Sequence, residues 1–515
     1  MKTRLKLLLL LLTFLIGNKL NAQNAPFNKV LSNTTGIEAF GLAATGENTF
    51  LLAGKTAFNN GALIWVDGSG EPLSAKSYSF GEHFVSFNHL VRCYDSSFVV
   101  AGRLENWSKS VQRAHLSRVS KTGELIWSKS IGLSEANLTA TSVQLTADSG
   151  YILSGYIGND YSGLNGLFAA RLDEAGDLKW FRGFESSDPS RGFSATQTPD
   201  QGFLLSGYAG TVGIWDTKAV LIKTDSYGNP EWAMQYQQNE NSQNVAFDAV
   251  AEADGYLCLT DNGLMKTDFS GNLSWFTNYG FLLSQPEFGA AQPRIKKMKN
   301  GGYHISGTAT YSSALYVLDQ NYNLRTANGV LLMLSDLVET AHQGLIAVGN
   351  GPIYFVKNHR FTDPHIGLIR LDSIGSAGDC NFPMNLYPFS DTMTGESLAF
   401  NLITEATLTD HTAVISPLPV AASWGCIDVI GNLPEAIKPL DIKIFPNPVT
   451  DILRIESSSP LQDAHLILYN IRMQPLIHLK PIRIDQLKMS SLPAGVYFLK
   501  ITNRESAGIW KIIKK

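Results

Sequence analysis

The sequence GFLLSGYAGTVGIWDTKAVLIKTDSYGNPEW, residues 202–232, decides the fold. It contains an apolar strand, a second apolar strand, a turn and a strand that begins near Trp232. In the turn, Asp225 is suited to accept backbone N–H bonds, and Gly228 is suited to the positive φ that a bulged hairpin needs. Together with SATQTPD at residues 194–200, the stretch predicts four consecutive strands.

This unit recurs along the chain. Its first part, Gly-aromatic-apolar-apolar-small-Gly with some variation, occurs in seven copies that end at Gly54, Gly102, Gly155, Gly207, Thr260, Gly307 and Gly349. Its second part, a turn Gly four residues before a Trp, is clearest at Gly123/Trp127, Gly176/Trp180, Gly228/Trp232 and Gly271/Trp275. In the sixth copy Tyr322 stands in the Gly position. A four-stranded repeat with a period near 50 residues indicates a β-propeller.

We therefore predict an all-β protein with a seven-bladed β-propeller at residues 23–378. The seventh repeat has no Trp-type fourth strand, whereas Phe27–Leu31 at the other end resembles one. We expect this N-terminal segment to complete the last blade and close the ring. The alternative is that the repeat from Leu331 onward is a degenerate blade, so that the ring has six blades or is open.

Residues 379–438 follow neither repeat pattern. We expect a small β appendage followed by a linker at residues 431–439. Cys380 and Cys426 bracket the appendage, and we expect a disulfide between them if the compartment is oxidising. The other two cysteines, Cys93 and Cys258, lie in apolar strand-like runs and are expected to be buried thiols.

The first 22 residues have the features of a secretory signal peptide. Basic residues precede an apolar run at residues 7–16, and a small residue at Ala22 marks the expected cleavage site. No later run reaches 18 apolar residues, so we expect no membrane span. The net charge of −4 and the lack of a basic stripe argue against a nucleic-acid partner.

The end of the chain carries a second export signal. It reads DIKIFPNPVTDILRIE from Asp441, then LILYNIRMQPL, then SSLPAGVYFLKI, and closes on WKIIKK. Residues 439–515 resemble the type A C-terminal sorting domain of the type IX secretion system of Bacteroidota, although Met473 stands where members of this family often have Gly. The resemblance implies a β-sandwich that the secretion machinery recognises, with the sorting motif at Pro446, Asn447, Pro448, Gly495 and Tyr497. It implies a secreted or cell-surface protein.

The sequence contains no motif that identifies a catalytic site, a metal site or a cofactor site. The repeated turn Asp residues are too sparse for calcium loops, so we expect them to be turn caps. We expect Trp127, Trp180, Trp232 and Trp275 to pack between blades rather than to form a sugar-stacking series. Trp107 and Trp215 lie instead in loops between strands, where binding residues gather, and are our candidate ligand contacts.

These observations favour a non-catalytic binding or adhesion protein for an extracellular glycan or protein. The alternatives are an extracellular polysaccharide- or polymer-degrading hydrolase or lyase with its site on the propeller axis, and a structural part of the cell envelope. Carboxylates, or a His/carboxylate pair, that converge on the axis would favour the enzyme. Small and apolar side chains there would argue against it.

Overall fold

The computed structural model describes residues 27–33, 35–159, 163–211, 216–238, 242–281, 283, 292–309, 312–330, 333–341, 344–350, 365–372, 381–383, 388–424, 442–457, 465–470, 475–479, 486–490, 492–502 and 507–515. These residues fall into two compact units, divided between Cys426 and Ile427. The predicted signal peptide at residues 1–22 and the predicted linker at residues 431–439 lie outside the described residues.

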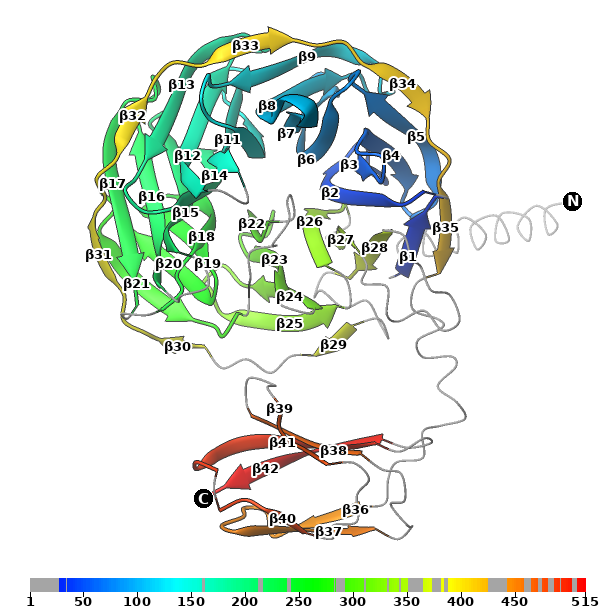
Figure 1. The fold of residues 1–515 in the computed structure, drawn as a ribbon, viewed down its shortest axis with the longest axis vertical. Coiled ribbons are helices and arrows are strands. Elements are labelled where there is room, and N and C mark those ends of the chain that lie inside the picture. The colour runs from blue at the N-terminus through cyan, green and yellow to red at the C-terminus, as the bar shows by residue number, and fades with distance from the viewer. Residues whose placement is uncertain are drawn as a thin grey trace, which may run out of the picture. The chain divides into compact units, whose positions relative to one another are not determined.

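The first unit is a β-propeller. Its described strands form seven groups of four antiparallel neighbours, arranged radially around an axis (Figure 1). Below, the groups are blades 1 to 7 in chain order. Blade 1 contains β2 (Ile37–Ala44), β3 (Thr49–Thr56), β4 (Gly61–Asp67) and β5 (Pro72–Ser79). Blade 2 contains β6 (Phe84–Arg92), β7 (Phe98–Asn106), β8 (Val111–Val119) and β9 (Leu125–Gly132).

Blades 3 and 4 are joined at a single parallel pairing, Asn165 with Ser190. Blade 3 contains β10 (Leu138–Leu145), β11 (Tyr151–Asn159), β12 (Gly163–Leu172) and β13 (Leu178–Glu185). Blade 4 contains β14 (Ser190–Gln197), β15 (Phe203–Thr211), β16 (Asp216–Thr224) and β17 (Pro230–Gln237).

The last three blades have shorter strands. Blade 5 contains β18 (Ala246–Glu252), β19 (Gly255–Thr260), β20 (Gly263–Thr267) and β21 (Leu273–Asn278). Blade 6 contains β22 (Arg294–Lys297), β23 (Tyr303–Ala309), β24 (Ser312–Leu318) and β25 (Leu324–Val330). Blade 7 contains β26 (Met333–Glu339), β27 (Leu345–Asn350), β28 (Ile366–Leu371) and β1 (Phe27–Ser32).

The repeated Gly of the anchor motif has a packing reason. The motif forms the second strand of each blade, and its Gly faces a bulge in the innermost strand. A Cβ atom on Gly54 would lie 1.8 Å from the Glu38 carbonyl oxygen, and one on Gly207 would lie 2.2 Å from that of Arg191. Because only Gly leaves room there, the motif marks where the second strand crosses the bulge.

The repeated turn Asp acts as a cap, as predicted. In the turn of blade 4, the Asp225 carboxylate accepts hydrogen bonds from the backbone N–H groups of Tyr227 and Asn229, each at 2.8 Å. Asp268 and Asp319 accept the same pair of bonds in blades 5 and 6. Their carboxylates are therefore used within single hairpins.

The N-terminal strand completes blade 7. β1 pairs antiparallel with β28 over five residues, from Phe27 opposite Arg370 to Leu31 opposite Ile366. This is the pairing that the sequence predicted. Val30 and Leu31 are buried, and Leu31 belongs to an apolar cluster that extends into blade 1. Lys29 reaches Glu71 in the hairpin of blade 1 through an ion pair, so the strand also contacts the neighbouring blade.

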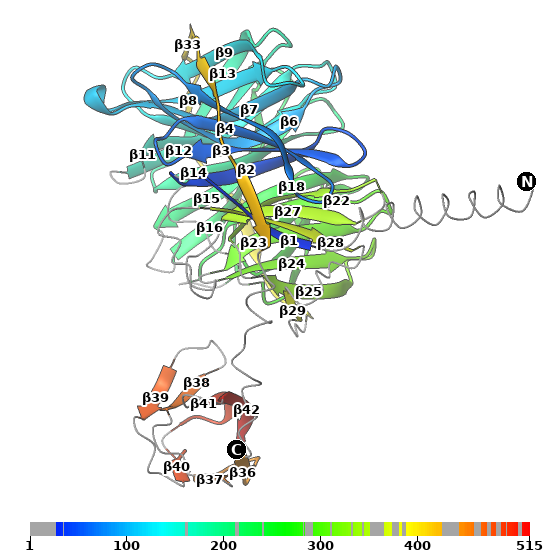
Figure 2. The same cartoon turned by 90° about the vertical axis from the view of Figure 1, so that its right-hand side faces the viewer.

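Residues 381–424 wrap around the outside of the propeller as a belt (Figures 1 and 2). Seven short strands each add a fifth strand to one blade, in the reverse of chain order from blade 6 down to blade 1 and then blade 7. The strands are β29 (Asn381–Pro383), β30 (Phe389–Ser390), β31 (Thr394–Ser397), β32 (Asn401–Ile403), β33 (Thr407–Asp410), β34 (Val414–Pro417) and β35 (Ala421–Trp424).

This belt differs from the expected compact β appendage. Each strand has only two to four residues, and the described side chains of β31, for example, are all exposed. Such strands bury too little apolar surface to form a core of their own. They satisfy their backbone groups on the outer edges of the blades instead, and thereby cover edges that would otherwise be open to pairing with other chains.

A buried histidine lies beneath the belt between blades 1 and 2. His115 is fully buried beside Phe80 and Phe87, and its Nε2 lies 2.9 Å from the Ser128 hydroxyl. Burial, together with the nearby His411 and His83, lowers the pKa of His115 to about 3. His411 belongs to the belt and contacts the Ser130 hydroxyl at 2.8 Å.

Acidification is therefore expected to destabilise this region. The folded pKa lies below the ordinary value of 6.5, so the unfolded chain binds the proton first and stability falls as the pH drops from about 6.5 towards 3. Each such histidine contributes about 1.4 kcal/mol per pH unit in that window. Thermal melting between pH 7 and pH 4 should show a smaller loss for His115→Gln than for the wild type.

Comparing the wild type with His115→Gln isolates the contribution of His115, because all other titratable groups are the same in the two proteins. Burial raises the pKa of Asp261 to about 7, so this carboxyl group favours the folded state as the pH falls below 7. Both proteins retain Asp261. Identical pH dependence in the wild type and in His115→Gln would contradict the assignment of a neutral buried His115.

The second unit is a small β-sandwich. One sheet contains β36 (Ile442–Phe445), β37 (Ile452–Ser457) and β40 (Gln486–Lys488). The other contains β39 (Pro475–Leu479), β38 (His465–Asn470), β41 (Gly495–Thr502) and β42 (Ala507–Lys514). Apolar side chains of both sheets, among them Leu453, Leu468 and Leu499, form one buried cluster, so this unit has a core of its own.

Candidate functional site

The two tryptophans singled out as ligand contacts are not brought together by the described structure. Trp107 begins a short 3-10 helix, Trp107–Lys109, that follows β7 in blade 2. Trp215 lies outside the described residues, as do Cys380 and Cys426, so the predicted disulfide is not shown. Cys93 and Cys258 are free and buried, as expected.

Charged side chains gather on the innermost strands instead. Asp248 lies at the bulge of β18, and Asp336 lies at the bulge of β26. Both are buried. Asp336 accepts a hydrogen bond from the backbone N–H of Leu42 in blade 1 at 2.9 Å and one from the Lys296 ammonium in blade 6 at 2.6 Å. Asp248 accepts one from the backbone N–H of Ile295 in blade 6 at 3.2 Å.

Two further side chains join this axial cluster. Arg294 of blade 6 donates to the Thr141 carbonyl oxygen at 2.9 Å. Thr141 belongs to blade 3, which is not a neighbour of blade 6, so the guanidinium reaches across the axis. His89 of blade 2 lies 3.1 Å from the Val143 carbonyl oxygen in blade 3. His89 and Lys296 are only half-buried, which indicates that water reaches this part of the axis.

The electrostatics of the cluster follow from its burial. Burial lowers the pKa of His89 to about 3, helped by the Arg294 charge, so the ring is neutral at neutral pH. Burial raises the pKa of Asp248 above its usual value, partly opposed by Arg294. Burial acts in the same direction on Asp336, but the basic side chains around it, led by Lys296, together hold the pKa of that carboxyl below its usual value.

The axial carboxylates act as ties between blades. Both oxygens of Asp336 accept hydrogen bonds, Oδ1 from Lys296 and the backbone N–H of Leu337, and Oδ2 from Leu42. Both oxygens of Asp248 accept backbone N–H bonds, from Ala249 and Ile295. At other junctions, uncharged side chains form the hydrogen bonds between blades. Asn88, for example, donates to the Ala140 carbonyl oxygen in the next blade.

The outer junctions between blades repeat a different contact. In blades 2, 3 and 4, the Trp of the fourth strand lies against the hairpin Gly of the following blade. A Cβ atom on Gly228 would approach Trp180 to 2.8 Å, and one on Gly271 would approach Trp232 to 3.0 Å. In two of these junctions the indole N–H also donates to a carbonyl oxygen of that hairpin, from Trp180 to Ser226 and from Trp232 to Phe269. These contacts confirm the predicted packing role of Trp180 and Trp232.

The junction between blades 5 and 6 departs from this pattern. Tyr322 takes the hairpin position with a positive φ of 64°, where the other hairpins have Gly. One shared contact persists, because the Tyr279 hydroxyl donates to the Tyr322 carbonyl oxygen at 2.6 Å, as the Tyr236 hydroxyl does to Gly271. Among the described residues, the structure records no hydrogen bond for the indole N–H of Trp275.

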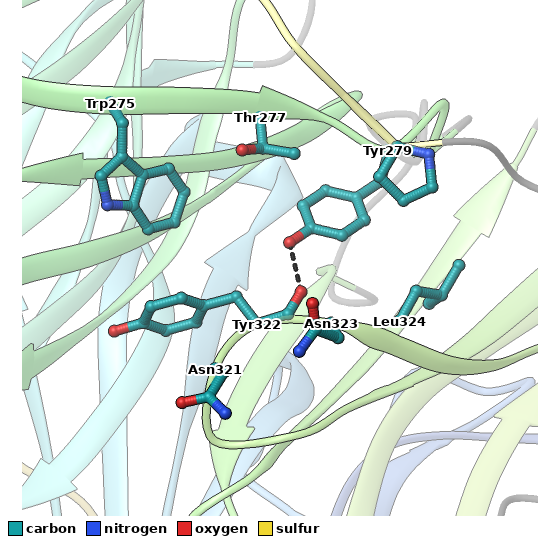
Figure 3. A pocket seen from close by; sticks show the side chains of 8 residues that line it. Trp275, Thr277, Tyr279, Asn321, Tyr322, Asn323 and Leu324 are labelled. Atoms are coloured by element: carbon teal, nitrogen blue, oxygen red, sulfur yellow. Dashed lines mark hydrogen bonds between the residues drawn. The ribbon is translucent and has the colours of Figure 1, made fainter.

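A pocket of about 440 Å³ opens at this junction (Figure 3). The rings of Trp275 and Tyr322 lie 5.2 Å apart between centroids and are tilted by 53°. Thr277 faces the hairpin from the same strand as Trp275, while Asn321 and Asn323 flank Tyr322 on the hairpin itself. The full lining is Trp275, Thr277, Tyr279, Asn321, Tyr322, Asn323, Leu324 and Pro388.

Sequence reasoning assigned Trp275 to packing and gave Tyr322 no role. The signal for the pocket was present, because Tyr322 interrupts the Gly that the other hairpins share. The axial cluster offered no such signal. Its five members come from four strands of four blades, and only Arg294 and Lys296 are near each other along the chain.

The predicted sorting-motif residues lie at the strand ends of the second unit. Pro446, Asn447 and Pro448 connect β36 to β37, and the Asn447 side-chain oxygen accepts a hydrogen bond from the Ile513 backbone N–H at 2.8 Å. Gly495 begins β41, in which the Tyr497 hydroxyl donates to the Pro493 carbonyl oxygen at 2.7 Å. These bonds hold two turns against the sheet of β38, β39, β41 and β42.

Metal-binding clusters and membrane-spanning helices are both absent from the residues that the structure describes. Within these residues, no three His, Cys, Asp or Glu side chains are grouped so that they could hold a metal ion. Nor does that part of the chain contain a helix with the length and apolar character needed to cross a membrane.

Residues 443–515 match the protein family described as the secretion system C-terminal sorting domain. The chain therefore carries a type IX sorting domain at its C-terminus, as the sequence predicted, and the protein is exported to the outer cell surface or released. The sorting domain implies engagement with the type IX secretion machinery.

No curated protein matches the chain. Among solved structures, it is similar to a streptogramin B lyase, with 10% identity and a TM-score of 0.42, over 67% of this chain and 98% of that one. It is also similar to the Dos1 propeller, with 11% identity and a TM-score of 0.40, over 68% of this chain and 96% of that one. The strand pairings within each blade define the propeller fold.

Proposed function

We propose that the protein is a non-catalytic binding or adhesion protein that recognises an extracellular glycan or protein. The observation that carries the proposal is the contrast between its two candidate sites. The axial carboxylates are occupied as ties between blades. The pocket between blades 5 and 6 is open, aromatic and lined by uncharged side chains. Its volume of about 440 Å³ lies within the range of small-molecule binding pockets.

A catalytic role at the axis is the second candidate. It is favoured by the convergence of His89, Lys296 and Asp336 from three blades, with partial exposure of the first two. General acid–base chemistry on a polymer needs such groups within reach of the substrate. The saturation of the Asp336 carboxylate by Leu42, Leu337 and Lys296 argues against that role.

One experiment separates the two candidates. The mature chain, residues 23–515, is incubated with a panel of insoluble polysaccharides and matrix proteins, and both retention and the release of reducing or unsaturated ends are measured. Retention without product supports the binding protein. Product that disappears in Asp336→Asn and in His89→Ala, while both variants stay folded, would establish the enzyme instead. No retention on any surface would contradict the binding function.

We also propose that the propeller is a ring of seven blades whose belt is closed by a Cys380–Cys426 disulfide. Asn381, at the start of the belt, pairs with blade 6, and Trp424, at its end, pairs with blade 7. These blades are neighbours, so the belt begins and ends on adjacent sheets. Cys380 directly precedes Asn381, and Cys426 follows Trp424 by two residues. An oxidising exterior would favour their bridge.

Reduction of this bridge is expected to loosen the belt. In the chain-entropy model, a loop of this length stabilises the folded state by roughly 4 kcal/mol. The double variant Cys380→Ser/Cys426→Ser should therefore melt below the wild type, and a reducing agent should lower the melting temperature of the wild type only. Peptide mapping of the unreduced protein should recover the two cysteines in one linked peptide. Two free thiols at these positions would refute the bridge.

A further inference from the structure

We propose that the pocket between blades 5 and 6 binds a neutral sugar unit against the aromatic surface formed by the adjoining rings of Trp275 and Tyr322. This inference rests on the proposed binding function and names the ligand class and the site. It follows from the departure of this junction from the contact made by Trp180 and Trp232 at the two preceding junctions.

The first step is the cost of Tyr322. A non-Gly residue at positive φ is strained by about 1–3 kcal/mol when its backbone conformation is sparsely populated, and the corresponding turns have Gly at φ values near 80°. Gly at this position would also let the hairpin lie on Trp275, as Gly271 lies on Trp232. Tyr322 therefore replaces the close backbone approach of a Gly by contact between its own ring and Trp275, and it adds strain. A strained residue of this kind is an outlier that marks a candidate functional position.

The second step is that the Tyr322 ring is held in place. Its hydroxyl donates to the Glu252 carboxylate at 2.5 Å. Glu252 is itself buried and is shared with Lys266 and the Tyr303 hydroxyl. The Tyr303 and Tyr322 rings stack at 5.6 Å between centroids. A side chain fixed by such a network presents its ring without losing further freedom when a ligand binds, which is the property of a preorganised site.

The third step is the chemistry of the lining. The faces of Trp275 and Tyr322 carry negative potential and suit the polarised C–H groups of a sugar ring. Thr277, Asn321 and the accessible indole N–H of Trp275 supply hydroxyl, amide and N–H groups for sugar hydroxyls. Glu252 is neutralised by Lys266 outside the lining. The absence of a charged side chain among the lining residues favours a neutral sugar over an acidic one.

The test uses the mature full-length chain and five neutral hexasaccharides: cello-, manno-, xylo-, laminari- and chitohexaose. Isothermal titration calorimetry should detect binding of at least one at millimolar concentration, with quenching of Trp fluorescence. Trp275→Ala should lower the affinity about tenfold or more, as expected for the loss of an aromatic contact in a binding site. Tyr322→Gly should lower it by a similar factor.

Matched variants separate binding from folding. Tyr322→Gly introduces the residue that other hairpins have, so it should leave the propeller folded. Trp180→Ala removes the equivalent Trp of blade 3, which lies beneath Gly228, and should lower the melting temperature without changing the affinity. Asn321→Asp places a charge at the rim and should weaken binding of a neutral sugar only slightly.

Two results would overturn the site. One is the failure of all five sugars to bind at millimolar concentration. The other is binding that Trp275→Ala and Tyr322→Gly leave unchanged. In either case, retention of the wild type on an insoluble polysaccharide or matrix protein would show that the binding function stands and that another surface carries it. Loss of retention in Tyr322→Gly on a protein surface alone would identify a protein ligand instead of a sugar.

Discussion

Deletion of residues 25–32 is expected to destabilise the whole propeller. The deletion removes β1, which pairs with β28 on one side and with β35 of the belt on the other. Val30 and Leu31 are buried, and burial of two such side chains contributes about 4 kcal/mol. With two hydrogen-bonded ladders lost as well, the melting temperature should fall by about 10 °C or more. Circular dichroism during heating measures the change.

The control is an equally long deletion of residues 431–438, in the predicted linker after the belt. This deletion removes no residue of the described sheets and should leave the melting temperature unchanged. Equal melting temperatures for the two deletions would contradict closure through β1. If the deletion of β1 lowers the melting temperature but blades 1 to 6 stay resistant to protease digestion, the strand stabilises blade 7 alone.

The repeat was predictable because each blade is built from local signals. The anchor Gly is required where the second strand crosses the bulge of the first, and the turn Asp and Gly are required within a single hairpin. All three requirements act between residues close in sequence, so they recur at a fixed period. The role of β1 was predictable although its pairing is non-local, because its sequence resembles the fourth strand that the seventh repeat lacks.

The belt was not predicted because its pairing is entirely non-local. β33, for example, pairs with β9, almost three hundred residues earlier in the chain. The belt strands start five to eight residues apart. That spacing is a weak periodic signal, but short polar strands carry no apolar alternation from which a partner could be inferred. The outer edges of the blades, which need a partner, dictate the pairing instead.

The two candidate sites differ in the same way. The axial cluster combines single residues from several blades, such as His89 and Asp336, which only the closed ring brings together. The pocket depends on one departure from a local pattern, Tyr322, and such a departure is visible in an alignment of the repeats. Interruptions of a structural repeat are therefore informative positions to examine first in a propeller sequence.

Deletion of residues 441–515 is expected to leave the protein folded but stranded in the periplasm. The sorting domain and the propeller are separate compact units, and the apolar core of the sorting domain is made of its own side chains, among them Leu453, Leu468 and Leu499. Removing it should therefore not lower the melting temperature of the propeller. Fractionation of cells should show loss of the protein from the surface and the medium, with recovery of the same chain inside the outer membrane.

Point variants test whether the secretion machinery requires the sorting domain to be folded. Leu499→Asp places a charge in the core of the sandwich, where an unpaired buried charge is strongly destabilising. Asn447→Ala removes the acceptor of the Ile513 backbone N–H and loosens the turn between β36 and β37. Both variants should reduce surface display without changing the melting temperature of the propeller, because we expect the secretion machinery to recognise the folded sorting domain. Normal display of the truncated chain would show that export does not depend on this domain. Normal display of Leu499→Asp, with loss of display for the truncated chain, would show that the machinery does not require the folded sandwich.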